Sequence, residues 1–271
     1  MASHEHYLPN PGFGWGYTPI TRIGEPRADT GMSFGVLRLR PDESFAADAS
    51  FETAALLLSG EVSFELGSRT ESRARGSVFD EEPVALHCAR GTTARLRARS
   101  EAELVLLQAE NDAEFEPRLF DASSLLESEL RDKGVLDDTS FRVVRAIFDR
   151  RNRPEAVLVL GEVLTLPGRW SSYPPHHHPQ PEIYHYRFTR PQGYGHGELG
   201  DAVVKVRHGD TVKILDGNDH AQVAAPGYGM YYVWAIRHLP GAPYTGFEFT
   251  EGHRWLKEPH PEVWRLKGAG T

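Results

Sequence analysis

Residues 174–182 read Pro-Pro-His-His-His-Pro-Gln-Pro-Glu, and this stretch decides the fold. On an extended strand successive side chains alternate between faces, so His176 and His178 share one face and His177 points away. At roughly 3.3 Å per residue their Cα atoms lie about 6.6 Å apart, which lets both imidazoles reach one ion. After the Pro-rich turn, Glu182 enters the neighbouring strand and can supply an oxygen ligand.

A fourth ligand follows further along the chain. His220 comes directly after a Gly-Asn-Asp turn and can close the site. Three imidazoles and a carboxylate suit a borderline divalent ion, and we expect one, with zinc as the first choice and iron(II), manganese or nickel as alternatives. Four protein ligands on an octahedral ion leave two positions for water or substrate. The competing interpretation is a solvated histidine tract that binds metal adventitiously, against which the spacing of Glu182 and His220 argues.

The sequence around this stretch consists of short β-like runs broken by turns. Many short strands at such spacing predict an all-β sandwich or barrel. One helix is expected from Asp121, where N-cap candidates precede leucines at helical spacing, to Gly134 as its stop. Residues 1–17, rich in Pro, Gly and aromatics, read as an extended arm held against a neighbour. The predicted strands include 31–39, 54–58, 62–66, 94–99, 104–107, 156–160, 203–207 and 231–234.

The two halves of the chain echo each other. Gly76 is followed eleven residues later by His87, as Gly209 is by His220, which favours duplication. We expect an N-terminal barrel with its arm over 1–115, a linker with a short helix over 116–145, and a metal-carrying barrel over 146–271. In the first barrel His87 matches His220 by position, but no His-x-His precedes Glu52. We therefore expect that barrel to be free of metal.

Composition narrows the range of partners. The net charge is −8 and no Lys/Arg block interrupts it, which disfavours nucleic acid because phosphate binding needs clustered cations. A single cysteine, Cys88, permits no intrachain disulfide and fits a reducing cytoplasm. We expect no secretory signal, since no basic start precedes an apolar run, and no membrane span, since no stretch approaches 18 apolar residues.

The metal pattern resembles the motifs of the cupin superfamily. Its first motif carries His-x-His and then Glu after three or four residues, and the glycine and histidine spacing of its second motif agrees with Gly209, Gly217 and His220. A closer resemblance, to the 5-deoxy-glucuronate isomerases of inositol catabolism, covers nearly the whole chain. That family is related to the 4-deoxy-L-threo-5-hexosulose-uronate ketol-isomerases. The matching stretches are ESRARGSVFDE (71–81), RAIFD (145–149), WSSYPPH (170–176), EIYHYRF (182–188) and APGY (225–228).

This resemblance implies a bicupin, which is two double-stranded β-helix (jelly-roll) barrels with a short linking helix. It also implies a cytoplasmic aldose–ketose isomerase that acts on a small sugar acid, converting 5-deoxy-D-glucuronate to 5-dehydro-2-deoxy-D-gluconate. Long β surfaces and the aromatic arm favour a homo-oligomer. Two rivals remain: a metal-dependent cupin dioxygenase with the same ligands, and a non-catalytic sugar-binding cupin.

The alternation of side chains between the two faces of a strand indicates further site residues. If Glu182 points inward then Tyr184 and Tyr186 do so as well, and all three are candidates for catalysis; the tyrosines are otherwise barrel-filling aromatics. By the same alternation Arg187 should face outward. The remaining candidates, for contact with the substrate and its carboxylate, are Gln222, which shares the face of His220, and two cations near the motifs, Arg169 and Lys213.

Overall fold

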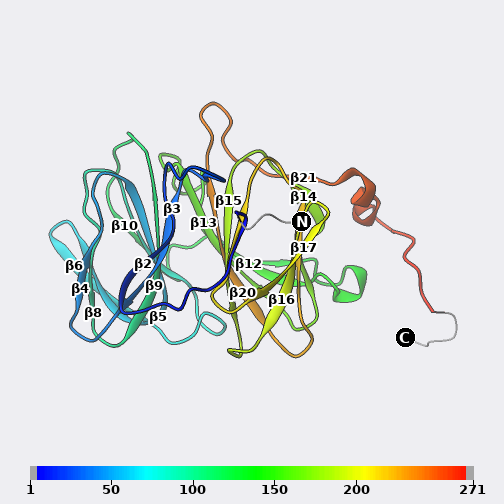
Figure 1. Ribbon diagram of the computed structural model, residues 1–271, viewed down its shortest axis with the longest axis horizontal. Coiled ribbons are helices and arrows are strands. Elements are labelled where there is room, and N and C mark those ends of the chain that lie inside the picture. The colour runs from blue at the N-terminus through cyan, green and yellow to red at the C-terminus, as the bar shows by residue number, and fades with distance from the viewer. Residues whose placement is uncertain (1–4, 267–271) are drawn as a thin grey trace.

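The computed structural model describes residues 5–266 and shows two barrels of antiparallel strands lying side by side (Figure 1). The all-β prediction is confirmed, and the runs expected at 31–39, 104–107 and 231–234 fall in strands. The first barrel contains β2 (Gly16–Thr21), β3 (Ser33–Leu39), β4 (Ser44–Ala46), β5 (Glu52–Leu66), β6 (Arg69–Arg75), β7 (Val84–Cys88), β8 (Arg95–Ala98), β9 (Ala102–Ala109) and β10 (Arg118–Phe120).

The second barrel is the half of the molecule on the right in Figure 1. Its strands are β1 (Tyr7–Leu8), β11 (Glu129–Arg131), β12 (Arg142–Phe148), β13 (Leu158–Thr165), β14 (Trp170–His177), β15 (Glu182–Phe188), β16 (Tyr194–Leu199), β17 (Ala202–Arg207), β18 (Thr211–Ile214), β19 (His220–Ala224), β20 (Met230–Arg237) and β21 (Glu248–Phe249). The helical segments are the 3-10 turns η1 (Leu136–Asp138) and η2 (Glu251–Lys257). Within residues 5–266, neither is long and apolar enough to cross a membrane.

The two barrels repeat one strand order. The first has a sheet in the order β7-β5-β9-β3-β2, and the second has β18-β15-β20-β13-β12. Around the rest of each barrel, β8 pairs with β4 in the first and β19 with β14 in the second. Duplication of one unit produces this arrangement.

The repeat corrects one expectation, that His87 corresponds to His220. His87 lies on β7, which pairs directly with β5 and so takes the place of β18. The counterpart of β19, where His220 lies, is β8. The shared interval of eleven residues therefore reaches different strands, because the turns of the two halves differ in length.

The runs expected at 54–58 and 62–66 belong to one strand, β5, which crosses between two sheets. Its first half pairs with β7 and β9, and its second half with β6 and β8. Gly60 lies at the crossing with φ +102°, and a Cβ there would lie 2.3 Å from the carbonyl oxygen of Glu101. Glycine permits the bend because it has no side chain and adopts positive φ readily.

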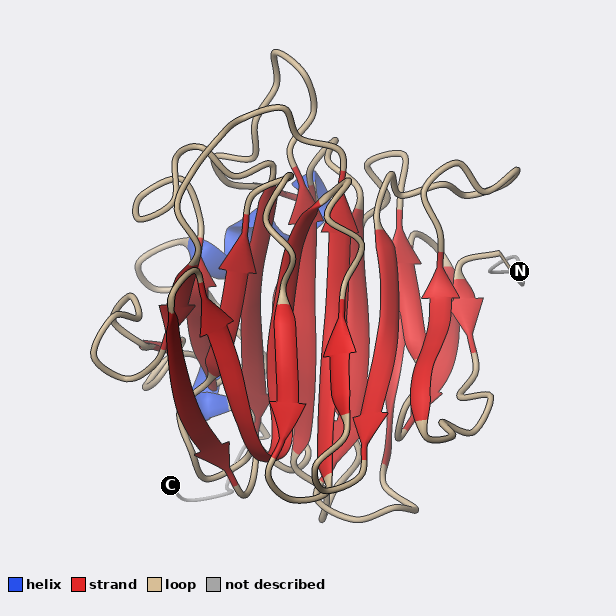
Figure 2. Ribbon diagram, turned by 90° about the vertical axis from the view of Figure 1, so that its left-hand side faces the viewer, coloured by secondary structure: helices blue, strands red, loops and turns tan. Residues whose placement is uncertain are grey.

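Three apolar clusters hold the molecule together, one inside each barrel and one between them. Strand β15 shows how alternation assigns side chains to them. Tyr184, Tyr186 and Phe188 fill the second barrel, whereas Ile183 packs into the cluster between the barrels. Figure 2 views the molecule from the side of the first barrel and shows its strands in front of those of the second. The inward direction predicted for the two tyrosines is confirmed.

Buried ion pairs also cross between the barrels. Arg75, at the end of β6, places its guanidinium 2.7 and 3.1 Å from the two carboxylate oxygens of Glu162 on β13, and both side chains are fully buried. Arg145 and Tyr231 donate to the same carboxylate at 3.0 and 2.9 Å. These contacts satisfy both oxygens of Glu162, so the buried charge is compensated.

Glu52 links the barrels in a second place. Its carboxylate accepts from the backbone N–H groups of Val157 and Leu158 at 2.9 and 3.1 Å, and from the ring of His87 at 2.9 Å. Arg153 donates to the other ring nitrogen of His87 at 3.0 Å, so the Nε2 proton of His87 points at Glu52. The ring nitrogens of His87 and the carboxylate oxygens of Glu52 therefore all have hydrogen-bond partners within the chain.

The linker differs from the prediction. The α-helical turns expected from Asp121 to Gly134 do not form, and η1 supplies the helical residues of this segment. The carboxylate of Asp121 accepts from Ser123 in a local turn and from Arg73 at 2.9 Å. Leu130 is 54% exposed and lies in β11, which pairs with β12, so the leucines share no buried face.

The N-terminal arm crosses from its own barrel to the second one (Figure 1). Strand β1 pairs with β18, and the hydroxyl of Tyr7 donates to Asp210 at 2.6 Å. The neighbour expected for the arm is thus the other half of the same chain. Strand β10 pairs with the first barrel, and β11 and β12 with the second. The domain bounds 1–115, 116–145 and 146–271 stay a prediction.

Candidate metal centre

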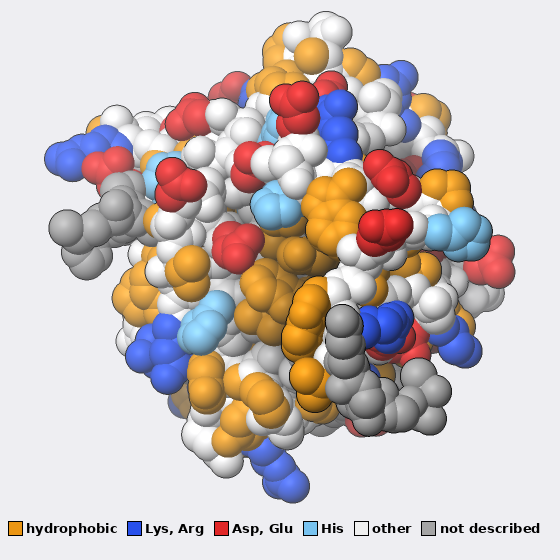
Figure 3. Space-filling view, turned by 90° about the vertical axis from the view of Figure 1, so that its right-hand side faces the viewer, with side chains coloured by type: hydrophobic (Ala, Val, Ile, Leu, Met, Phe, Trp, Pro, Cys, Tyr) orange, Lys and Arg blue, Asp and Glu red, His pale blue; other side chains and the backbone are white. Residues whose placement is uncertain are grey.

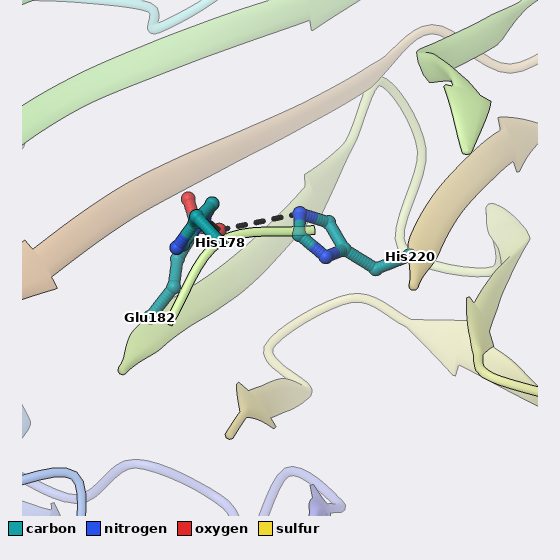
Figure 4. A group of neighbouring side chains, drawn as sticks. All are labelled: His178, Glu182 and His220. Carbon is teal, nitrogen blue, oxygen red and sulfur yellow. Dashed lines mark hydrogen bonds and ion pairs between the residues drawn. The ribbon is translucent and has the colours of Figure 1, made fainter. Parts of the chain in front are cut away.

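Three of the four predicted ligands meet at one point of the second barrel (Figure 4). The Oε2 atom of Glu182 lies 3.1 Å from Nε2 of His178 and 3.4 Å from Nε2 of His220. One ligand atom from each residue lies within 4.8 Å of the other two, and all three residues are buried. His178 follows the end of β14, Glu182 begins β15 and His220 begins β19, so separate strands converge as predicted.

His176, the fourth predicted ligand, lies beside this group and is not one of the three that converge. Its ring centroid lies 4.3 Å from that of His220, and it is 7% exposed. His177 lies on the other side of the strand, where Nδ1 is 2.6 Å from Asp219 and the side chain is 39% exposed. The expected alternation of the three histidines is therefore present.

Two of the histidines are set in the tautomer that metal binding requires. Nδ1 of His176 lies 3.1 Å from the carbonyl oxygen of Ser172, and Nδ1 of His220 lies 3.0 Å from that of Asn218. A carbonyl only accepts, so each Nδ1 carries the hydrogen and each Nε2 presents a lone pair. Nε2 of His220 is buried and has no hydrogen-bond partner among residues 5–266. The donor set fits a divalent ion.

Burial keeps these imidazoles neutral. Loss of solvent lowers the pKa of His176 well below its ordinary value, and the neighbouring His220 and His178 lower it further. Loss of solvent also lowers the pKa of His220, although the charge of Glu182 opposes the shift. Neutral imidazole is the form that coordinates a metal, so the site is ready at neutral pH.

A cavity of about 520 Å³ adjoins the centre and is lined by His176, His178 and Glu182. Figure 3 views the second barrel from the side away from the first, and hydrophobic side chains gather around a hollow in that face. The volume suits a small organic ligand. Further lining residues are Arg131, Arg142, Ser172, Tyr173, Tyr184, Tyr232, Trp234, Tyr244 and Phe247.

The two candidate tyrosines differ in access. Tyr184 lines the cavity, and its hydroxyl lies 3.4 Å from Oγ of Ser172. Tyr186 does not line the cavity. Its hydroxyl donates a hydrogen bond to Oε1 of Gln222 at 2.5 Å. Gln222 in turn donates to Oγ of Ser172 at 3.2 Å and is itself buried behind the wall. Tyr186 and Gln222 therefore support the wall of the cavity from behind.

The structure does not bring the two predicted cations to the cavity. Lys213 is 2% exposed, and its ammonium group lies 3.0 Å from Glu25, on the opposite side of β18 from the barrel interior. Arg169 is half-buried in the turn before β14 and does not line the cavity. Arg187 faces outward as predicted, where it pairs with Glu103 of the first barrel at 2.6 Å.

Other residues reach the site without having been predicted. Tyr244 and Phe247 lie between β20 and β21, and their rings pack on His178 and His176 at 5.0 and 4.2 Å between centroids. An irregular segment carries no periodic signal that could have placed them. Arg142 alternates with Val144 on β12, and this alternation would have placed it on the cavity side once the strand order was known.

Comparison with known proteins identifies the family. The sequence profile of the KduI/IolB family matches residues 8–256. The chain belongs to the KduI/IolB family. The 5-deoxy-glucuronate isomerase of Shouchella clausii is 26% identical over 227 residues, which cover 76% of this chain and 80% of the relative. That of Lacticaseibacillus casei is 28% identical over 231 residues, or 72% and 83%. Membership of the KduI/IolB family places the chain among isomerases, and the predicted resemblance is confirmed.

Solved structures give the same fold. An IolB-like protein from Salmonella typhimurium superposes with a TM-score of 0.82 at 23% identity, covering 93% of this chain and 99% of that protein. Oxalate decarboxylase from Bacillus subtilis, a protein with Mn(II) centres, gives a TM-score of 0.61 at 10% identity and covers 90% of this chain and 79% of that protein. This member of the KduI/IolB family thus has a cupin-like fold, as expected.

Proposed function

We propose that the protein is a metal-dependent aldose–ketose isomerase that converts 5-deoxy-D-glucuronate to 5-dehydro-2-deoxy-D-gluconate in inositol catabolism. The convergence of His178, Glu182 and His220 beside a ligand-sized cavity carries the proposal. The curated relatives are named for this isomerase, which supports the choice of substrate.

We assign His176, His178, Glu182 and His220 as the residues that hold the ion, with zinc as the first choice. A divalent ion bound there supplies a Lewis acid for the carbonyl and neighbouring hydroxyl of the substrate. Iron(II), manganese and nickel share the ligand preference of zinc, so metal analysis must decide between them. Asn218 and Ser172 orient the imidazoles through their carbonyl groups.

Isomerisation moves a proton between adjacent carbons, and negative charge develops on a substrate oxygen when the carbon loses its proton, so a hydrogen-bond donor beside that oxygen is needed. Tyr184 lines the cavity and carries such a donor. Burial raises the pKa of Tyr184 well above 10, and the charge of Glu182 raises it further, so the hydroxyl stays protonated. Tyr184 therefore donates a hydrogen bond to a substrate oxygen on which negative charge develops.

Neighbouring residues hold this donor and exclude water. The chain of hydrogen bonds from Tyr186 through Gln222 to Ser172 fixes the wall on which Tyr184 rests. Tyr244 closes the opposite side against His178. A drier cavity strengthens each electrostatic contact made there.

The proposal also includes the location and the oligomeric state of the protein. We place the protein in the cytoplasm, since the substrate of such an isomerase is a metabolite and the single Cys88 is buried and unpaired. We also propose a homo-oligomer, because the exposed strand edges offer surfaces for a second copy.

Incubation of the metal-loaded protein with 5-deoxy-D-glucuronate without oxygen tests the function. We expect conversion to the ketose by NMR, with the same rate in air and no oxygen consumption. Turnover that requires oxygen would replace the proposal with a dioxygenase, and tight binding without conversion would replace it with a sugar-binding protein.

A further inference from the structure

The cavity extends beyond the metal centre to a group of arginines on β11, β12 and the loop after β12. A sugar acid held by its carbonyl end needs a partner for its carboxylate, because burying an unpaired charge is costly. The cations lining the cavity are Arg131, Arg142, Arg150 and Arg151. Their surroundings show which of them is built for that purpose.

Arg142 is fixed in place and has free donors. It is 4% exposed, and a single nitrogen, Nη1, makes its contacts within the described chain, at 2.6 Å to Asp132 and 2.7 Å to the carbonyl oxygen of Ser140. Nε and Nη2 make no hydrogen bond within residues 5–266, and neither is among the sealed polar atoms there. These two nitrogens form one edge of the guanidinium, which matches the two oxygens of a carboxylate.

The charge balance around Arg142 favours an anion. Asp132 accepts from Arg142 with one oxygen and from Lys257 with the other, at 2.8 Å. Two cations therefore share one carboxylate, and the cluster keeps a net positive charge. Because Asp132 is almost buried, at 9% side-chain exposure, the guanidinium cannot easily turn away.

The other three arginines are less suitable. Arg131 places Nε and Nη2 on Glu129 at 2.8 and 2.5 Å, so its paired edge is occupied. Arg151 makes the same type of contact with Asp149, and its side chain is 64% exposed. Arg150 is exposed, so it is screened by water and free to move.

Arg142 and three of the predicted metal ligands face the same cavity. Tyr232 and Ser172 line this cavity as well, and their side-chain oxygens lie 3.3 Å apart. The carbonyl oxygen of Ser172 in turn orients His176. Arg142 and His176 therefore border the same cavity, together with Tyr232 and Ser172.

We propose that Arg142 binds the carboxylate of the sugar-acid substrate through Nε and Nη2 and thereby selects acids over neutral sugars. This inference rests on the proposed function for the identity of the acid. Asp132 and Lys257 act as positioning residues that hold the guanidinium.

Comparison of an acid with its methyl ester isolates the carboxylate. For turnover, kcat and KM are measured with 5-deoxy-D-glucuronate and its methyl ester, using the Arg142→Gln, Arg142→Lys and Arg150→Gln variants. Replacing Arg142 by Gln should lower kcat/KM for the acid roughly 10²-fold, mostly through KM, and for the ester by less than about 3-fold. Arg142→Lys should fall between, and Arg150→Gln should keep the ratio of acid to ester.

A binding experiment distinguishes failure of this inference from failure of the proposed function. Calorimetric titration of the metal-loaded protein with D-glucuronate and its methyl ester needs no turnover. We expect the wild type to prefer the acid, Arg142→Gln to lose that preference and Arg142→Lys to keep only part of it. Arg142→Lys retains the ion pair with Asp132 and decides the matter if Arg142→Gln does not fold. No preference in the wild type, or an unchanged preference in Arg142→Lys, overturns the assignment, whatever substrate is turned over.

Discussion

At the scale of the residue, the candidate centre depends on which atom of each side chain faces inward. The carbonyl oxygens of Ser172 and Asn218 fix the tautomers of His176 and His220, and Glu182 contributes its carboxylate. Each partner is a backbone group or a buried side chain, so the geometry depends little on solvent. The arrangement is therefore set before an ion arrives, which lowers the cost of ordering the ligands.

The two tyrosines on β15 have different proposed roles: Tyr184 contacts the substrate, and Tyr186 supports the wall of the cavity. Tyr184→Phe removes a donor that lines the cavity, and we expect kcat to fall on the order of 10²-fold while the metal stays bound. Tyr186→Phe is the matched control, because it removes a hydroxyl bonded to Gln222 outside the cavity. Steady-state kinetics with metal analysis would reject the distinction if Tyr186→Phe lost as much turnover as Tyr184→Phe.

The metal-ligand candidates could be predicted because alternation along a strand needs no tertiary information. The same rule would have excluded Lys213, since its neighbours Val212 and Ile214 pack inside the second barrel. Proximity in sequence to a motif was the only basis for Lys213 and Arg169. Arg142 lies 34 residues before His176, and the pairing of distant strands brings it to the site.

At the scale of the element, the long strand β5 belongs to two sheets because it bends at one residue. The bend of β5 falls at Gly60, where strand pairing passes from one sheet to the next. The sequence showed two runs separated by three residues, which reads equally well as a hairpin or as one bent strand. The helix expected from Asp121 failed for a related reason, because local side-chain contacts and pairing with β12 outweighed helical spacing.

Gly60→Ala should destabilise the fold far more than a comparable change in a turn. The new Cβ meets the backbone of Glu101 at 2.3 Å, and the positive φ adds strain of about 1–3 kcal/mol. Gly67→Ala is the control: its φ is +62° but nothing lies within 4 Å. In urea unfolding we expect the midpoint to fall strongly for Gly60→Ala and slightly for Gly67→Ala. Equal losses would mean that the close approach at Gly60 is unimportant.

At the scale of the whole molecule, the surface between the barrels is buried as fully as either interior. The cluster there includes Phe34, Leu56, Ile183 and Tyr231, all fully buried. Within this surface both carboxylate oxygens of Glu162 are hydrogen bonded, by Arg75, Arg145 and Tyr231. The site wall on β15 and β20 therefore rests on the first barrel, which gives that barrel a structural role.

His185 should make stability depend on pH. It is fully buried against the first barrel, and desolvation and the charge of Arg187 hold its pKa well below 6.5. The unfolded chain takes up a proton below about pH 6.5 that the folded chain does not, so stability falls as pH decreases, by up to about 1.4 kcal/mol per pH unit from this group.

Urea unfolding at pH 7.5, 6.5 and 5.5 measures this dependence. His185→Gln keeps a donor for Thr211 and an acceptor for Arg187 but cannot titrate. We expect the variant to lose less stability than the wild type between pH 6.5 and 5.5. Parallel lines for the two proteins would show that His185 is not the group responsible.

The metal content of purified variants decides whether these side chains hold an ion. Plasma mass spectrometry should find one divalent ion per chain in the wild type and in His177→Ala, whose side chain points away from the centre. It should find almost none in His178→Ala or His220→Ala. A full equivalent of metal in His178→Ala and His220→Ala, or loss of the ion in His177→Ala alone, would contradict the assignment.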